Sequence, residues 1–563
     1  MASAKVVEDD EPSPPAVVEG DVPVVEVLAL ALPEVISVAV VSDGPVEAGA
    51  PVPASSAHPA VNTNSTHARR MTSGYGHASH RVNGCDRAPP MSETTAIVIT
   101  LVAYKVALLI IGVLAQRKTT SADDFFLGGR SLGPWVAGLS ASASSSSAWS
   151  LLGVSGFAYA HGLSAVWLFP ACVGGFALNW YVLAPALRRH SLASGSLTVT
   201  EILAGPRDAP GSRPIRVLAT GIVLVSLMAY VASQFQGAGK TFAETFAMSM
   251  TEAVLLGSAV VVVYTMLGGF LAVSLTDTLQ GFVMALASIA LPAAALSAVG
   301  GFDALQQGMA AVDTPGYLSV TEGMPTAAGI GFVLGLLGIG LGYPGQPHVV
   351  NRFMAVRDEA ALARARQIAM GWAVILYIGM IVLGLCARVM LPPLGDGEVA
   401  FIASARHVFP PVIAGVVLAS VLSAIMSTAD SQLLVAASAV AHDLPAEAPD
   451  AAPEVMVRRS RIVVFALSAA AVVAALVGDA SIFKKVLFAW TAMGAAFGPL
   501  LIVQLLVGPV RWQARVGAIA LGFGSAVLAY SIPATAGTAW ERVAPFVLAL
   551  AVAWWGTRGA PQR

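Results

Sequence analysis

The chain contains about thirteen apolar stretches, each close to the roughly 20 residues with which an α-helix crosses a lipid bilayer. Their centres lie near positions 104, 146, 174, 226, 262, 287, 337, 378, 424, 469, 495, 523 and 549. With 56% apolar and 11% charged residues over 563 positions, these stretches are too long and too numerous for the core of a soluble protein. The sequence therefore predicts an all-α integral membrane protein with about thirteen transmembrane helices.

Two of these stretches are interrupted, one by the run SASASSSS at 140–147 and the other by GIGLGYPGQP at 338–347. Irregular backbone at membrane depth persists only where protein, water or a bound solute satisfies its polar groups. Paired interruptions in two halves of a chain indicate the binding site of a secondary transporter. If spans two to six and seven to eleven are the two halves, each has five helices and begins with a broken helix. This pattern predicts a five-plus-five inverted repeat.

The basic residues between the spans predict the orientation of the chain. Arginine and lysine follow mainly the odd-numbered spans, at Arg117, Lys118, Arg130, Arg188, Arg189, Arg207, Arg213, Arg216, Arg352, Arg357, Arg364, Arg366, Arg458, Arg459, Arg461, Arg511, Arg515, Arg558 and Arg563. Because basic loops stay in the cytoplasm, we expect the N-terminus outside and the C-terminus in the cytoplasm.

Residues 1–90 differ in composition from the rest, with frequent Pro, Glu, Asp, Ser and His. We expect a disordered N-terminal extension here, with Met91 as an alternative translation start, and a single transmembrane domain over 91–563. The net charge of -2 leaves no basic excess for binding nucleic acid. Three cysteines that lie far apart in the chain predict neither a disulfide framework nor a metal cluster.

Chemistry other than transport has little support in the sequence. It contains no phosphate-binding Walker loop for an ATP-driven pump and no nucleophile paired with a base, so we expect neither an enzyme nor an organic cofactor. The expected partners are the lipid bilayer and a small-molecule solute, without nucleic acid and without an obligate protein partner.

Several motifs occur in the order and spacing of one transporter family. They are FLGGRSLG at 126–133, LGGFLAVS at 267–274, TDT at 276–278, GLGY at 340–343, GQPH at 345–348, MST at 426–428, QLL at 432–434, AW at 489–490 and GAAFGP at 494–499. Over about residues 94–560 the chain resembles the sodium:solute symporters, and most closely the bacterial sodium:proline symporters. The resemblance implies thirteen helices with a five-plus-five inverted repeat, location in the bacterial inner membrane, and Na+-coupled uptake of a small organic solute.

An Na+ site within the membrane needs oxygen ligands from hydroxyls and unwound carbonyls. The first interruption offers freed carbonyls around Ala143 and Ser146, and the ninth span offers adjacent hydroxyls at Ser427 and Thr428. The resemblance implies that these four residues and Ala424 form the sodium site. The alternative is that these hydroxyls only bond back to their own helix.

Acidic residues inside the spans suggest a second ion site. Proline symporters usually carry an aspartate where this chain has Ser145, so we expect either a lower sodium affinity or another acid that balances the charge. A carboxylate within a span usually marks an ion or proton path, and we expect Asp277, Asp430 and Ser431 to outline a second cation site or exit path. The alternatives are helix capping by Asp277 and a structural pair for Asp430.

An amino-acid solute needs donors for its carboxylate, acceptors for its amine and a surface for its side chain. The second interruption supplies Tyr343, and Tyr230, Gln234 and Gln236 supply polar groups on the fourth span. The resemblance implies proline contacts at the positions of Tyr230, Tyr343 and Pro347. The remaining candidates are Ser145 and Trp149, although Trp149 is equally well explained as a packing aromatic.

The sequence therefore predicts Na+-coupled uptake of L-proline or a related amino acid. Ile339 replaces a tryptophan typical of proline symporters, which keeps pantothenate or a monocarboxylate as an alternative solute. Alternatives of other classes are a membrane solute sensor with a transporter-like fold and an uncoupled uniporter.

Overall fold

The computed structural model describes residues 93–116, 126–266, 270–445, 453–478 and 481–558. The expected N-terminal extension lies outside these residues. Every regular element among those described is helical, and one isolated bridge pairs Leu132 with Val356. Nine helical segments in this part of the chain are long and apolar enough to cross a membrane, and two shorter apolar helices span Ile97–Leu108 and Met250–Val263. The predicted all-α membrane fold is confirmed.

The first half of the chain forms α2 (Glu93–Gln116), α4 (Pro134–Ser145), η2 (Trp149–Gly153), α5 (Val154–His161), α6 (Leu168–Ala177), η4 (Leu178–Leu183), α7 (Ala184–Ser194), α8 (Val199–Ala204), α9 (Ser212–Phe246), α10 (Met250–Thr265), α11 (Phe270–Val299) and α12 (Phe302–Ala310). The second half forms α13 (Thr326–Gly338), η5 (Ile339–Gly345), α14 (Pro347–Met354), α15 (Glu359–Met390), η6 (Gly397–Val399), α16 (Ala400–Val408), α17 (Pro411–Ser438), η7 (Ala439–Asp443), α18 (Pro453–Val477), α19 (Ile482–Leu506), α20 (Trp512–Ser531), α21 (Ala539–Arg542) and α22 (Ala544–Trp555). Each predicted span coincides with a helix or with a helix pair that contains a break.

Polar side chains fix several helix starts. The side chain of Thr198 accepts a hydrogen bond from the backbone N–H of Glu201 at the start of α8, and Asp358 and Ser481 cap α15 and α19 in the same way. Such caps satisfy N–H groups that have no partner within the helix. Large apolar side chains such as Phe282, with more than half of its surface exposed, face outward as a lipid-facing surface requires.

The two broken helices run in opposite directions. Leu132, before α4, donates its N–H to the carbonyl of Ala355, after α14. At the other end of the bundle, Leu163, after α5, donates its N–H to the carbonyl of Tyr317, before α13. The start of one broken helix therefore lies beside the end of the other, as an inverted repeat requires.

Corresponding elements of the two halves pack in equivalent ways. In the first half α4 packs on α11 and α9 packs on α10, and in the second half η5 packs on α19 and α17 packs on α18. Across the halves α11 packs on α17, and α19 packs on α9. This correspondence supports the two repeats inferred from the positions of the interruptions.

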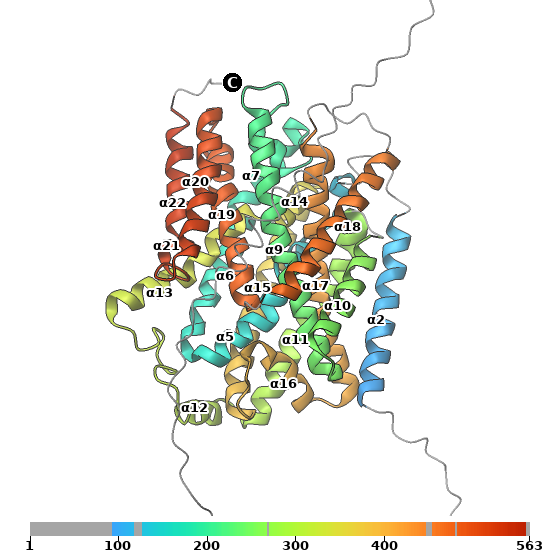
Figure 1. Cartoon of the computed structure of the whole chain (residues 1–563), viewed down its shortest axis with the longest axis vertical. Helices are drawn as coiled ribbons and strands as arrows, with labels where there is room; N and C mark the ends of the chain where they lie inside the picture. Colours follow the sequence, from blue (N-terminus) through green and yellow to red (C-terminus); the bar gives the residue numbers. More distant parts are fainter. Residues whose placement is uncertain (1–92, 117–125, 267–269, 446–452, 479–480, 559–563) are drawn as a thin grey trace, which may run out of the picture.

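Arginines gather at one end of the bundle, which we call the arginine-rich end. Arg188 bonds the carbonyl of Val356 there, and Arg207 and Arg216 lie near the end of α17, with Arg207 bonding the carbonyl of Pro445. Figure 1 shows α7 at this end and α12 and α16 at the opposite end. At the opposite end Lys240 pairs with Glu398.

Arg352 departs from the predicted pattern of loop charges. The sequence places it among the basic residues that follow the seventh span, but it lies within α14 and only 2% of its surface is exposed. The prediction was wrong because α14 resumes the helix after the break and carries this arginine back into the protein interior.

Candidate functional site

The first break separates α4 from η2. The backbone leaves the helical conformation at Ser146, where φ is -112° and ψ is 89°. Serine hydroxyls compete for nearby backbone groups and so weaken a helix. The Ser145 hydroxyl, for example, donates to the carbonyl of Ser142 at 2.9 Å. The serine run thus accounts for the position of the break.

Side chains of α9 stabilise this break. Gln234 accepts a hydrogen bond from the N–H of Ala148 at 3.0 Å, and the hydroxyl of Ser147 accepts one from the N–H of Trp149 at 3.1 Å. The Tyr230 hydroxyl donates to Ser147 at 3.2 Å. The structure therefore brings Tyr230, Gln234 and Trp149 together at the break, and their contact with a solute stays a prediction.

Gln236 lies elsewhere. Its side-chain amide donates to the carbonyls of Ala475 and Gly478 at 2.9 and 2.6 Å, beside α18. The interpretation of Gln236 as a solute contact was wrong, because two residues along a helix change the face by about 200°.

The second break is held by side chains from two other helices. Gln346, which has extended backbone, donates from its amide to the carbonyl of Trp490 at 2.9 Å. The indole N–H of Trp490 donates to the carbonyl of Ile339 at 3.1 Å, and Asn179 donates to the carbonyl of Tyr343 at 3.1 Å. These bonds satisfy carbonyls that the helix cannot, and they fix the break against α19 and η4.

The candidate sodium site lies where the first break meets α17. The Ser427 hydroxyl is 3.1 Å from the carbonyl oxygen of Ala143 and 3.3 Å from that of Ala424. All three residues are fully buried. Oxygens of this kind are the ligands that a hard monovalent cation requires at membrane depth.

The other two residues of this site lie close by. The Thr428 hydroxyl is 3.3 Å from the carbonyl oxygen of Ser144, and Ser146 receives a hydrogen bond from the indole of Trp372 at 3.3 Å. Both hydroxyls on α17 therefore reach carbonyls of the broken helix across the helix interface. The alternative, in which they only bond back within α17, does not describe their contacts.

Asp277 forms a buried ion pair with Arg352. The guanidinium is 2.7 Å from both the Asp277 carboxylate and the Ser431 hydroxyl, and its Nε donates to Ser140 at 2.7 Å. Ser140 and Ser144 also donate to the carboxylate, at 2.9 and 3.0 Å. Asp277 lies well inside α11, so its alternative role as a helix cap is excluded.

Asp430 faces a different environment from Asp277. One carboxylate oxygen accepts the N–H of Ser431 at 2.7 Å. The other oxygen is buried and has no hydrogen-bond partner within the described part of the chain. Asp277 and Ser431 thus share Arg352, and each of the two carboxylates keeps one buried oxygen without a hydrogen-bond partner among the described residues.

A narrow cleft adjoins this ion pair on the side of the arginine-rich end. It is lined by Phe126, Leu197, Phe270, His348, Asn351, Arg352, Ser431, Leu434, Val435 and Ser438. Because Arg352 and Ser431 form part of its wall, the cleft reaches the interior charges directly.

Aromatic side chains from the two breaks and from neighbouring helices lie close to one another. The Tyr343 ring lies 4.7 Å from Trp490 in a T-shaped contact, and its hydroxyl is 3.0 Å from that of Tyr377. Tyr230 lies 6.5 Å from Trp490, and Trp149 lies 6.4 Å from Tyr377. Tyr343 is buried here and is therefore not an interfacial anchor.

Buried polar atoms without partners among the described residues also occur here. They are the indole nitrogen of Trp149, the amide oxygen of Gln346 and both ring nitrogens of His348. His348 follows Pro347, the first residue of α14, and its ring lies 6.2 Å from Tyr230. Since buried polar groups are normally paired, these atoms are candidates for contact with a solute.

Replacing Gly175 with alanine is expected to abolish most transport, because the added Cβ would lie 2.2 Å from the Tyr343 ring. That ring is held by Tyr377 and cannot move without disturbing the site. The matched control is Gly174→Ala, whose Cβ would meet nothing within 4 Å. The measurement is initial solute uptake at equal protein amount. Equal uptake by the two variants would contradict the need for Tyr343 in its present position.

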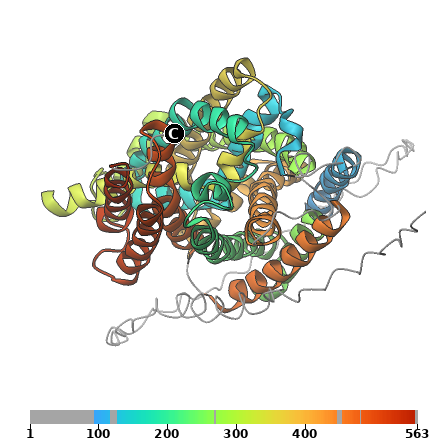
Figure 2. The same cartoon turned by 90° about the horizontal axis from the view of Figure 1, so that it is seen from above.

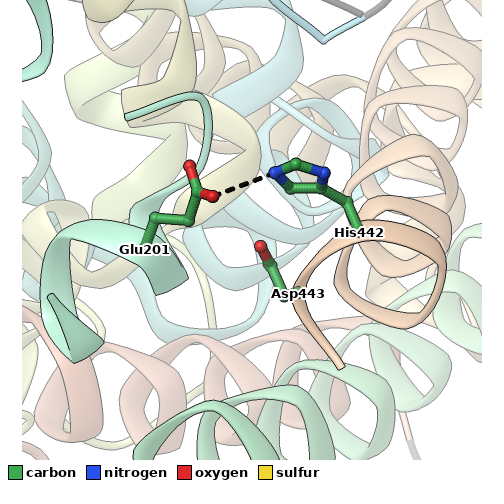
Figure 3. A group of neighbouring side chains, drawn as sticks. All are labelled: Glu201, His442 and Asp443. Carbon is green, nitrogen blue, oxygen red and sulfur yellow. Dashed lines mark hydrogen bonds and ion pairs between the residues drawn. The ribbon is translucent and has the colours of Figure 1, made fainter. Parts of the chain in front are cut away.

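A second polar cluster lies at the arginine-rich end. Figure 3 shows Glu201 of α8 pointing toward His442 of η7, with Asp443 beside them, and their ligand-type atoms lie within 4.8 Å of one another. Thr198 donates to Asp443 at 2.8 Å, and Arg216 lies 4.0 Å from the same oxygen. This nearby guanidinium favours an ion-pair network over a divalent metal site.

The charge state of Glu201 agrees with such a network. Burial alone would raise its pKa, but hydrogen bonds from His442 and from the N–H of Leu197 lower the pKa to about 2. Glu201 is therefore ionised at neutral pH, and it ties α8 to the end of α17.

Comparison with known families agrees with this arrangement. A profile of the sodium:solute symporter family matches residues 125–522. The chain belongs to this family. The family profile covers both breaks, the candidate sodium site and the buried ion pair.

Individual relatives are similar over most of their length. The osmoregulated proline transporter of Bacillus subtilis is 37% identical over 415 residues, which is 73% of this chain and 83% of that protein. The sodium/proline symporter of Salmonella typhimurium is 34% identical over 429 residues, 74% of this chain and 84% of that protein. The sodium/proline symporter of Escherichia coli is 34% identical over 430 residues, with the same coverage of 74% and 84%.

A solved structure of a Na+-coupled sialic acid symporter, in a substrate-bound outward-open state, has a similar fold. Its TM-score is 0.68 at 18% identity, and the match covers 84% of this chain and 100% of that chain. This likeness confirms the predicted symporter architecture.

Sequence reasoning missed several residues in and around this site, among them Lys105, which contacts Met426 beside Ser427. Arg352 was counted as a loop charge, and Trp490 was noted only as part of a motif. Lys105 was not singled out, although a lysine inside an apolar span is itself a signal of function. His348 follows the second break directly, and its unpaired ring nitrogens are visible only in the structure.

Proposed function

We propose that this protein couples inward movement of Na+ to uptake of a small organic solute, L-proline or a related amino acid. The observation that carries the proposal is the contact of the Ser427 hydroxyl with the carbonyls of Ala143 and Ala424 at the first break. Ala143, Ser146, Ala424, Ser427 and Thr428 supply the ion ligands. The names of the relatives support proline as the first solute to test.

The solute occupies the space between the two breaks. Tyr230, Gln234, Tyr343, Trp149 and the backbone beside Pro347 face this space, and Ser145 lies at the end of α4. Aromatic rings offer an apolar surface to a pyrrolidine ring, and the unpaired donors and acceptors suit a carboxylate and an amine. Pantothenate or a monocarboxylate stays the alternative, because Ile339 gives the site one aromatic fewer.

Coupling follows from the shared position of the ion ligands. A cation held by both the first break and α17 stabilises one arrangement of these two elements, and the solute binds beside that break. An Na+ ion entering down about 100 mV gains roughly 2.3 kcal/mol, and a tenfold concentration gradient adds about 1.4 kcal/mol. These terms suffice for several-hundred-fold accumulation of a neutral solute.

Asp277, Asp430 and Ser431 form a second cation site or the exit path of the ion, on the side of the cleft. Arg352 holds Asp277 and Ser431 together, so in this arrangement a guanidinium supplies the positive charge between them. The arginine-rich end faces the cytoplasm by the positive-inside rule. This orientation places the N-terminus outside, with residues 91–563 forming the transport domain in the bacterial inner membrane.

Uptake of radiolabelled L-proline into proteoliposomes tests the function. We expect uptake under an inward Na+ gradient and only background uptake under a matched K+ gradient, with a separate pH gradient as the third arm. Equal uptake in Na+ and K+ would contradict sodium coupling. Na+-dependent uptake of pantothenate or a monocarboxylate, without uptake of proline, would keep the mechanism and change the solute.

A further inference from the structure

Lys105 lies in the middle of α2, the first described helix. This helix runs parallel to α17: the Tyr104 hydroxyl is 2.5 Å from that of Ser423, and the Lys105 ammonium contacts the sulfur of Met426. Figure 2 shows α2 at the edge of the bundle, so its inner face alone meets the protein. Lys105 therefore lies at the depth of Met426, the residue next to Ser427.

The contact with Met426 leaves the ammonium poorly satisfied. A thioether sulfur is a weak acceptor, and among the described residues it is the one side-chain atom to which Lys105 donates. A charged group inside the membrane is costly and is retained where it pairs with another charge or acts on an ion path. The partner is therefore to be sought on the face of α17 that meets α2.

Asp430 is the candidate for that partner. It follows Met426 by four residues and so lies on the same face of α17, one turn further along. Both Asp430 and Asp277 have one buried carboxylate oxygen without a hydrogen-bond partner among the described residues, but Asp277 already has an ion pair with Arg352. The interior charges of Asp277, Arg352 and Asp430 sum to one negative charge, and Lys105 balances it.

We propose that Lys105 is a positioning residue that sets the Na+ affinity of the adjacent site. Its positive charge neutralises Asp430 and repels a cation bound at Ser427 and Thr428. Without this ammonium, the uncompensated Asp430 carboxylate attracts Na+ more strongly. This inference rests on the proposed sodium site, and it adds a residue from outside the two repeats.

The test is a double-mutant cycle with Lys105→Met and Asp430→Asn. Na+ binding is measured on purified protein by isothermal titration calorimetry without solute, and the Na+ dependence of proline uptake is measured in proteoliposomes. We expect Lys105→Met to lower the half-saturating Na+ concentration about tenfold, and Asp430→Asn to raise it. The double variant should return close to the wild-type value, and Lys105→Arg should retain that value.

The matched control is Val102→Met, which adds the same side chain on the lipid-facing side of α2, where Val102 is 55% exposed. This variant should leave the Na+ dependence unchanged. An unaltered half-saturating Na+ concentration in Lys105→Met, with normal Na+ binding by the wild type, would overturn this inference alone. A wild type that binds no Na+ would overturn the sodium site and this inference together.

Discussion

Replacing both Ser427 and Thr428 with alanine is expected to raise the Na+ concentration for half-maximal uptake about hundredfold. The interaction of each hydroxyl with a charged partner contributes about 1.5 kcal/mol, and about 1.4 kcal/mol corresponds to a tenfold change in affinity. Both hydroxyls reach carbonyls of the first break, at 3.1 Å for Ser427 and 3.3 Å for Thr428. The loss removes ion ligands and also loosens the contact between α17 and the break. The measurement is the Na+ dependence of proline uptake in proteoliposomes.

The matched control for this pair is Ser420→Ala. The Ser420 hydroxyl is equally buried on α17 but bonds the carbonyl of Val417 in its own helix at 2.6 Å. This variant should show wild-type Na+ dependence. If Ser420→Ala shifted the Na+ dependence as much as the double variant does, the loss of any buried hydroxyl from α17 would explain the effect. Ser427 and Thr428 would then no longer be assigned as Na+ ligands.

The sequence carried enough information for the architecture and the breaks. Apolar stretches predict transmembrane helices because the bilayer imposes one length on all of them. The two interruptions follow from serine hydroxyls in one case and from glycine and proline in the other. The position of one interruption relative to the other, however, depends on how the two repeats pack. The contact between Ser427 and Ala143 was expected only from the resemblance to a family.

The charged residues were harder to place from the sequence. Counting loop charges assigned Arg352 to a loop, because a linear count does not show that the helix resumes after the break. Lys105 was overlooked since one lysine hardly changes the hydropathy of a long apolar stretch. In both cases the residue in contact is far away in the chain: Asp277 for Arg352 and Met426 for Lys105.

The second large effect concerns the ion pair of Asp277 and Arg352. Arg352→Met is expected to destabilise the protein by about 3–5 kcal/mol, because it leaves a buried carboxylate without its counter-charge. Asp277→Asn should destabilise the protein as well, because the guanidinium then lacks its anionic partner. For both variants the measurements are the thermal unfolding temperature in detergent and the amount of folded protein in the membrane. The control is Arg357→Met, which breaks an exposed pair with Asp358 and should have little effect.

The double variant Asp277→Leu with Arg352→Met separates structure from transport. A buried ion pair replaced by apolar side chains is often neutral for stability, so thermal stability should return close to that of the wild type. Transport should stay lost, because the cleft would then end at an apolar wall instead of the charged groups of the ion path. Recovery of both stability and uptake would show that the pair has a structural role alone. Recovery of stability without uptake would place Asp277 and Arg352 on the route of the ion.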